Sequence, residues 1–436
     1  MFPGVVISVR VAAALLAMTL ALPAPAAAQR PAGPFAGLFG RTPPRTGQEA
    51  TMVEARGTVG GQYDGFLRGA PPDGPIAGGG ASANAALTFE RRRDRFELRG
   101  RTEAARQQFL QTPTLGGTTY DSRVTVASRL TTRLTLNGTA SATRSPFFQF
   151  AFATLPGDTP GVMVPADRLT TQLMPHDDFE GTVGFTSQFA KRSSISATMS
   201  KRATLYRSRP EDDYSALGSR AEFRHRLNRT ATLRLAYGRE QARHAIFGPG
   251  EFVHEVIDAG IDLDRELAIG RRVTFAFYAQ NSMVREAGGP RRYRLNGGLT
   301  LRRAFGRSWS AAVKINRDTT FEPGFTAPLF SDGASLTLGG LLSSRFEWTT
   351  SLGGRRGHVG YASADKFQNY DATTRLTTAL TKKTGLYAQY TYYDYTVPPA
   401  ATIAGLLPAM SRQQVSAGVT LWLPIFNNVR ALRDPR

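Results

Sequence analysis

Hydrophobic and polar residues alternate with a period of two from about residue 50 to near the end of the chain. In "VSAGVTLWLPIF" (415–426), Val415, Val419 and Leu423 share one face, and Ser416 and Thr420 share the other. A helix would repeat every 3.6 residues, so this alternation indicates strands with two unlike faces. The same pattern recurs in 193–206, 272–280, 293–302 and 308–316.

The connections between these strands also alternate, between two kinds. Short basic segments occur at 91–95, 130–133, 189–193, 226–230, 269–272, 304–308, 342–345 and 380–384. Longer segments with proline, glycine and acidic residues occur at 66–79, 109–118, 145–176, 207–213, 246–251, 285–291, 318–332, 361–368 and 396–410. Together they predict nine hairpins, hence about 18 antiparallel strands, with 16 as the alternative count.

The fold class predicted from these strands is an all-β, transmembrane, up-and-down β-barrel. The strands are longer than the roughly 5–6 residues usual in soluble sheets, and they suit the about 9–11 residues of a tilted membrane-spanning strand. In lipid every backbone group must be paired, so only a closed barrel has no exposed edge. A soluble sandwich or solenoid is disfavoured because no block of sequence supplies a second layer over the apolar face.

The two ends of the chain are predicted to lie outside the barrel. Arg10, the apolar run "VAAALLAMTLAL" and small residues up to Ala28 are typical of a signal peptide over 1–28, and an uncleaved anchor helix is the rival interpretation. The proline-, glycine- and arginine-rich segment 29–48 is predicted to be a disordered periplasmic leader, 49–426 the barrel, and 427–436 a periplasmic tail. Short turns on the side of both termini place that side in the periplasm and the long loops outside a Gram-negative outer membrane.

The charged residues of the polar face bear on the function of the barrel interior. The formal net charge is +20, and the polar face carries more basic than acidic residues. The predicted lumen-lining basic residues are Arg99, Arg101, Arg123, Arg129, Arg220, Arg224, Arg234, Arg294, Arg302, Lys314, Arg355 and Arg375. The predicted acidic ones are Glu97, Glu222, Asp258, Asp262, Glu347 and Asp371. Two interpretations stay open: a lumen that favours anions, or arginines that brace the inner wall through acids and carbonyls.

The longest loop, 145–176, is also the most apolar. Its phenylalanines Phe147, Phe148, Phe150 and Phe152 could fold inward as a constriction, because a barrel of this size leaves an aqueous channel unless something fills it. They could equally extend a strand through the outer interface as part of the aromatic girdle.

Signals for catalysis, metals and nucleic acid are weak, so we expect no enzyme, no metal site and no cofactor. His176 beside Asp177 and Asp178 suggests a hydrolase, but no nucleophile-elbow serine accompanies it. His254 and Asp258 share a face but are too few for a metal site. The chain contains no cysteine. Nucleic acid is not expected as a partner of an exported protein.

The C-terminal region shows a resemblance. "FQNYDATTRLTTALTKKTGLYAQYTYYDYT" (367–396) places five tyrosines in its second half, predicted to mark the outer membrane interface. With the following "AGVTLWLP", it resembles putative β-barrel porins of bacterial outer membranes, including those of exopolysaccharide and exosortase systems. The end is also similar to the signal read by the barrel-assembly machinery, with Gly418, Leu421 and Leu423 in its places. Ala417 and the ten residues after Phe426 depart from that signal.

Two functions follow as hypotheses. One is an outer-membrane channel that passes anionic solutes or an acidic polysaccharide. The other is a structural or interaction barrel with a closed lumen. An outer-membrane hydrolase is a third, weaker hypothesis. The expected partners are outer-membrane lipid or lipopolysaccharide and the assembly machinery, and the last strand is expected to close the barrel near Val53–Val59. A charge at Leu421 is predicted to block insertion and one at Thr420 to be tolerated.

Overall fold

The structure is a computed structural model. It describes residues 48–68, 78–110, 117–147, 173–207, 210–228, 231–244, 251–263, 265–266, 273–286, 291–305, 308–320, 325, 327–360, 366–398 and 408–431. The predicted signal peptide and almost all of the predicted leader lie outside the described residues.

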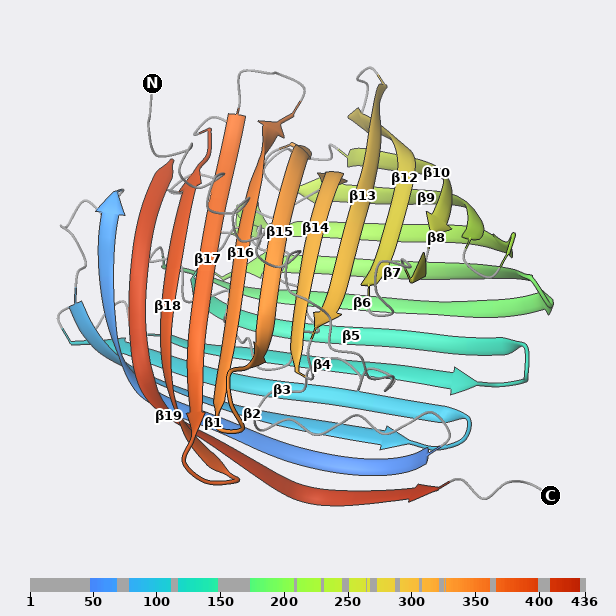
Figure 1. Cartoon of the computed structure of the whole chain (residues 1–436). Coiled ribbons are helices and arrows are strands. Elements are labelled where there is room, and N and C mark those ends of the chain that lie inside the picture. The colour runs from blue at the N-terminus through green and yellow to red at the C-terminus, as the bar shows by residue number, and fades with distance from the viewer. Residues whose placement is uncertain are drawn as a thin grey trace.

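The described residues form one closed antiparallel sheet (Figure 1). Each strand pairs with its neighbours in chain order, and β1 also pairs with β19. β10 and the two-residue β11 both pair with β12, so together they form one interrupted strand of an 18-stranded barrel. The predicted fold class and strand number are therefore confirmed.

The strands are β1 (Gln48–Arg68), β2 (Gly78–Arg92), β3 (Phe96–Phe109), β4 (Gly117–Arg129), β5 (Leu134–Phe147), β6 (Leu173–Ala190), β7 (Ser193–Tyr206), β8 (Tyr214–Arg226), β9 (Ala231–His244), β10 (Glu251–Leu263), β11 (Arg265–Glu266), β12 (Val273–Glu286), β13 (Arg292–Phe305), β14 (Trp309–Thr320), β15 (Leu329–Leu341), β16 (Phe346–Val359), β17 (Lys366–Ala379), β18 (Thr384–Thr396) and β19 (Ala409–Ala431). A short 3-10 helix, η3 (Pro210–Asp212), precedes β8. Among these elements no helix is long and apolar enough to cross a membrane.

The connections define two ends of the barrel. Tight links such as 93–95, 191–192 and 380–383 join strands at one end, which we call the short-turn end. The described chain starts and finishes there, at Gln48 and Ala431. The other end, where β1 leads to β2 and β5 to β6, is the long-loop end.

The barrel closes where the sequence predicted. Val53 is opposite Phe426 and Val59 is opposite Val419 in the β1–β19 ladder. β19 continues to Ala431, five residues into the segment expected to be a tail, because β1 extends down to Gln48 and offers partners for it.

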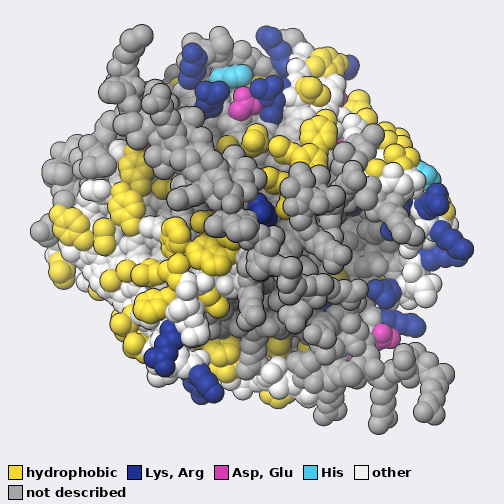
Figure 2. Space-filling view, viewed as in Figure 1, with side chains coloured by type: hydrophobic (Ala, Val, Ile, Leu, Met, Phe, Trp, Pro, Cys, Tyr) yellow, Lys and Arg dark blue, Asp and Glu magenta, His cyan; other side chains and the backbone are white. Residues whose placement is uncertain are grey.

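The two faces of the wall are unlike. Along β1 and β19, Val59 and Val415 are 65% and 53% exposed, whereas the neighbouring Gln62 and Ser416 are 5% and 3% exposed. Exposed large hydrophobic side chains point outward from nearly every strand. Figure 2 shows hydrophobic side chains mainly on the left and toward the upper right of the view, with Lys and Arg mainly toward its margins.

The tyrosines of β18 correct one expectation. Tyr390, which is 38% exposed, points outward, but Tyr387, Tyr393 and Tyr395 are buried inside the barrel. They alternate along one strand, so the cluster divides between two faces and does not form a single band at the membrane interface. The inward tyrosines belong to the lumen.

Candidate functional site in the barrel lumen

One group of lumen charges lies on β2 and β3 near the short-turn end. Arg99 Nη2 lies 2.6 Å from Glu97 Oε1 and 3.4 Å from Glu90 Oε1. Arg92 Nη2 donates to the same Glu97 oxygen at 3.2 Å. Two arginines thus share two carboxylates on the inner wall, which neutralises charge locally.

The next residues along β3 continue this arrangement. Arg101 Nη2 donates to Glu103 Oε2 at 2.8 Å, and Asn84 of β2 donates to the other oxygen of Glu103. Arg101 also faces Arg123 of β4 directly across the ladder. Two like charges in register repel unless an anion lies between them.

A second group lies on β8, β9 and β10. Asp258, with a completely buried side chain, accepts from Arg220 Nη2 at 2.7 Å and lies 3.1 Å from Arg234 Nε. Arg220 also contacts Glu222 at 3.1 Å, and Arg224 contacts the other oxygen of Glu222. A buried carboxylate held by two arginines is expected to brace the wall, because removing either partner would leave a buried charge.

Three further basic residues make polar or aromatic contacts. Arg294 Nη2 contacts the Ser331 carbonyl at 3.4 Å and Asp332 at 3.5 Å. Arg355, which is buried, donates to Ser331 Oγ at 2.7 Å. Arg375 lies over the ring of Tyr387, 4.4 Å from its centroid, in a cation–π arrangement.

Four of the predicted cations are different. Among the described residues, no carboxylate lies within salt-bridge distance of Arg123, Arg129, Arg302 or Lys314. Arg302 and Lys314 are diagonal neighbours on β13 and β14, since Thr300 is opposite Lys314 and Arg302 opposite Ala312. β4 and β13 lie far apart around the closed sheet, so these cations approach the lumen from two separate walls.

Two of the remaining predicted acidic residues lie on the inner wall, and the side chain of the third lies outside the described residues. Glu347 of β16 is buried, and the Asp371 carboxylate of β17 lies against Gly353 of β16. Asp262 belongs to β10, but its side chain is outside the described part of the structure.

A buried pair that the sequence did not single out lies at the β1–β19 seam. Arg412 Nε and Nη2 donate to the two oxygens of Asp64, each at 2.6 Å. Gln414 Nε2 donates to Asp64 at 3.1 Å and to Gln62 at 3.4 Å. The sequence did contain a signal for this buried pair. Gln62 and Asp64 are two residues apart, and so are Arg412 and Gln414, so the members of each pair share a face of their strand.

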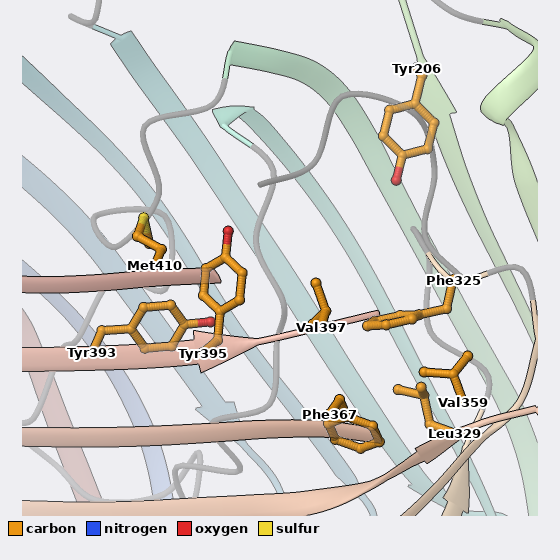
Figure 3. Packing of buried hydrophobic residues seen from close by; sticks show 9 residues of the cluster. All are labelled: Tyr206, Phe325, Leu329, Val359, Phe367, Tyr393, Tyr395, Val397 and Met410. Atoms are coloured by element: carbon orange, nitrogen blue, oxygen red, sulfur yellow. The ribbon is translucent and has the colours of Figure 1, made fainter. Parts of the chain in front are cut away.

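Aromatic side chains cross the lumen at the long-loop end. Nine buried residues form one cluster there: Tyr206, Phe325, Leu329, Val359, Phe367, Tyr393, Tyr395, Val397 and Met410. Figure 3 shows Tyr206 approaching from β7 with its hydroxyl directed toward the residues of β15–β19. Since β7 and β17 belong to different walls, this cluster narrows the barrel interior at that end.

The predicted constriction is a separate feature. Phe147 ends β5, but its side chain and all of Phe148, Phe150 and Phe152 lie outside the described residues. The aromatic narrowing that the structure describes comes from other strands. Its members are spread along the sequence and only the closed barrel brings them together.

The histidines make pairwise contacts. His176 Nε2 lies 3.2 Å from Asp178 Oδ2, and its ring is 5.6 Å from that of Tyr206. His254 Nδ1 lies 3.7 Å from Glu240 Oε2. Among the described residues, no group of three or more His, Cys, Asp or Glu could hold a metal ion.

The predicted assembly signal lies on both faces of β19. Leu421 and Leu423 point outward, at 38% and 39% exposed. Gly418 is opposite Gly60, and a Cβ on it would lie 2.1 Å from the Val59 carbonyl oxygen. The close approach of β1 to β19 at this point therefore requires glycine.

Comparisons with solved structures find bacterial outer-membrane proteins. OpdL of Pseudomonas aeruginosa is 12% identical with a TM-score of 0.43, over 87% of this chain and 99% of that chain. The outer membrane protein OpdK of the same organism is 9% identical with a TM-score of 0.41, over 86% and 98%. OccK2 (OpdF) of that organism, solved with glucuronate, is 8% identical with a TM-score of 0.44, over 87% and 98%.

No protein-family model matches the chain, and no curated protein matches it.

Proposed function

We propose that the protein is an outer-membrane channel whose lumen admits small anionic solutes, or an acidic polysaccharide in extended form. In this proposal the apolar outer face contacts lipid, the short-turn end and both termini lie in the periplasm, and the long-loop end faces outward. The closed sheet supports the contact with lipid, because each described strand is paired on both sides.

The observation that carries the proposal is a set of four lumen cations that have no carboxylate within salt-bridge distance among the described residues: Arg123, Arg129, Arg302 and Lys314. Unneutralised cations on the wall of an aqueous pore raise the local concentration of anions and repel cations. The arginines of β2–β3 and β8–β10 differ from these four, since acidic residues offset all of their charge in the first group and most of it in the second.

Reversal potentials in planar bilayers under a salt gradient test the proposal. We expect anion selectivity for the wild-type protein. Replacing Arg302→Glu and Lys314→Glu together should shift the reversal potential toward cation selectivity. The matched control is Lys382→Glu with Lys383→Glu, which changes the net charge equally in a short-turn connection.

Cation selectivity of the wild-type channel would refute the proposal. An equal shift in the lumen variant and in the turn variant would also contradict it, because selectivity would then follow net charge and not the lumen wall.

A closed structural barrel is the second candidate, and the aromatic cluster at the long-loop end favours it. If Tyr206, Phe367 and Tyr393 seal the lumen, the protein would act through its surfaces as an anchor of an envelope or exopolysaccharide assembly. Absence of any conductance in bilayers that contain demonstrably folded barrel would support this candidate over the channel.

A further inference from the structure

A group of cations lies on the outward face of the barrel. Lys201 of β7, Arg239 of β9 and Arg285 of β12 form what we call the outer basic patch. They alternate with inward residues, because Arg202, Gly238 and Val284 occupy the positions next to them. Lys201 and Arg239 are exposed, and Arg285 is half-buried. β7, β8, β9, β10 and β12 are adjacent strands (Figure 1).

The ladder register brings the three cations together. Lys201 and Arg285 belong to one cross-strand row, which runs from Lys201 through Leu217, Gln241 and Val253 to Arg285. Arg239 lies two residues nearer the middle of the barrel, in the row of Ser219 and Glu255. With strands about 4.8 Å apart and a rise of about 3.4 Å per residue, neighbouring members of the patch have backbones roughly 12 Å apart.

The row on the short-turn side of Arg239 is apolar and aromatic. Tyr237 is opposite Ile257, Ile257 is opposite Asn281, and Asn281 is opposite Leu295, so these four residues form one cross-strand row. Ile257 and Leu295 are 61% and 68% exposed. Tyrosine is enriched where the hydrocarbon layer meets the headgroups. The outer basic patch lies on the long-loop side of Tyr237, which is the side where headgroups are expected.

Among the described residues, no carboxylate lies within salt-bridge distance of Lys201, Arg239 or Arg285. Glu255 is directly opposite Arg239 in the ladder but accepts a hydrogen bond from the Tyr237 hydroxyl at 3.1 Å. Cations at the edge of a lipid layer are attracted by anionic headgroups, and the arginine guanidinium pairs well with phosphate.

We propose that the outer basic patch binds the phosphate groups of a phosphorylated glycolipid in the leaflet around the long-loop end. This inference rests on the proposed function, because that proposal places the long-loop end on the outer side of the membrane. Three separated cations suit a headgroup that carries more than one phosphate, and the apolar row beside them suits its acyl chains.

Binding of lipid A to the full-length barrel in detergent tests this inference. The two probes are lipid A with its phosphates and the same lipid A after phosphatase treatment, and the proteins are the wild type and the Lys201→Gln/Arg239→Gln/Arg285→Gln variant. We expect saturable binding of the phosphorylated lipid only, and about a tenfold weaker binding by the variant, since charge-assisted contacts are lost. The matched control is Arg93→Gln/Arg345→Gln/Lys383→Gln, which removes three charges from the short turns and should bind like the wild type.

Equal binding of the two lipids by the wild type would overturn the inference, even if the patch variant failed to fold. Equal weakening in the patch variant and the turn control would do the same, because binding would then reflect net charge. Reversal potentials of the same preparations separate the two proposals: anion selectivity without lipid binding contradicts this inference alone, and lipid binding without conductance contradicts the channel alone.

Discussion

At the scale of single residues, neighbours on one strand are expected to meet different surroundings. Leu421 points outward and is opposite Gly57, while Thr420 points into the lumen opposite Thr58. Leu421→Arg should lower the fraction of folded, heat-modifiable barrel in liposomes, because a lipid-facing arginine is destabilising by an amount that grows with its depth, up to about 2–4 kcal/mol at the bilayer midplane. Thr420→Arg should fold nearly as the wild type does.

The pair is its own control, since both variants add the same side chain to adjacent positions of β19. Equal folding of the two variants would contradict the assignment of the outward face to lipid. Equal loss of folding would indicate that any bulky residue in this strand disturbs the close contact of Gly418 with β1.

At the scale of elements, β1 and β19 are joined by a buried ion pair as well as by their ladder. Arg412→Ala should reduce the free energy of unfolding in urea by about 3–5 kcal/mol, because Asp64 would be left buried without its bidentate partner. The double variant Arg412→Ala/Asp64→Ala should be more stable than Arg412→Ala alone. Additive losses in the double variant would mean that the two side chains stabilise the seam independently.

Strands could be predicted from the sequence because a period of two is a local property. The closure near Val59 could also be predicted, since an up-and-down barrel must join its first and last strands. The partners of each lumen arginine could not, because a shift of one residue in register changes every cross-strand neighbour. Asp258 is far from Arg220 in the sequence and only the ladder through β9 brings them together.

The tyrosines of β18 show why the prediction of a tyrosine cluster at the membrane interface was wrong. Tyr390 and Tyr393 suit either face of a barrel wall, because a phenol ring packs against lipid and against other aromatic side chains alike. Their odd or even position along the strand decides which face of the wall each tyrosine occupies. The inward tyrosines are recognised as part of a cluster only when β7 places Tyr206 across the lumen from them. Contacts between opposite walls leave no signal in a local pattern.

At the scale of the whole molecule, the basic residues fall into three sets: some are paired within the barrel wall, some face the lumen, and some lie on the outward face. Arg220 and Arg234 hold buried Asp258 within the wall, whereas Arg302 and Lys314 face the lumen with no carboxylate within salt-bridge distance among the described residues. Arg239 belongs to a third set, on the outside. The net charge of +20 therefore does not measure the charge of the lumen, and selectivity should depend on the second set alone.

In the proposed channel, the aromatic cluster is expected to limit how much of the lumen a solute can reach from the long-loop end. Phe367 and Tyr393 are both buried in it, so replacing them with alanine should widen the long-loop end. We expect single-channel conductance of Phe367→Ala/Tyr393→Ala to rise on the order of twofold or more, because hydrophobic constrictions limit conduction. The matched control is Tyr370→Ala/Tyr390→Ala, which removes aromatic rings of the same strands from the outward face and should leave conductance unchanged.

An unchanged conductance in the lumen variant would show that solutes bypass the cluster. A wild-type barrel that conducts only after this substitution would instead identify the cluster as the closure of the structural barrel.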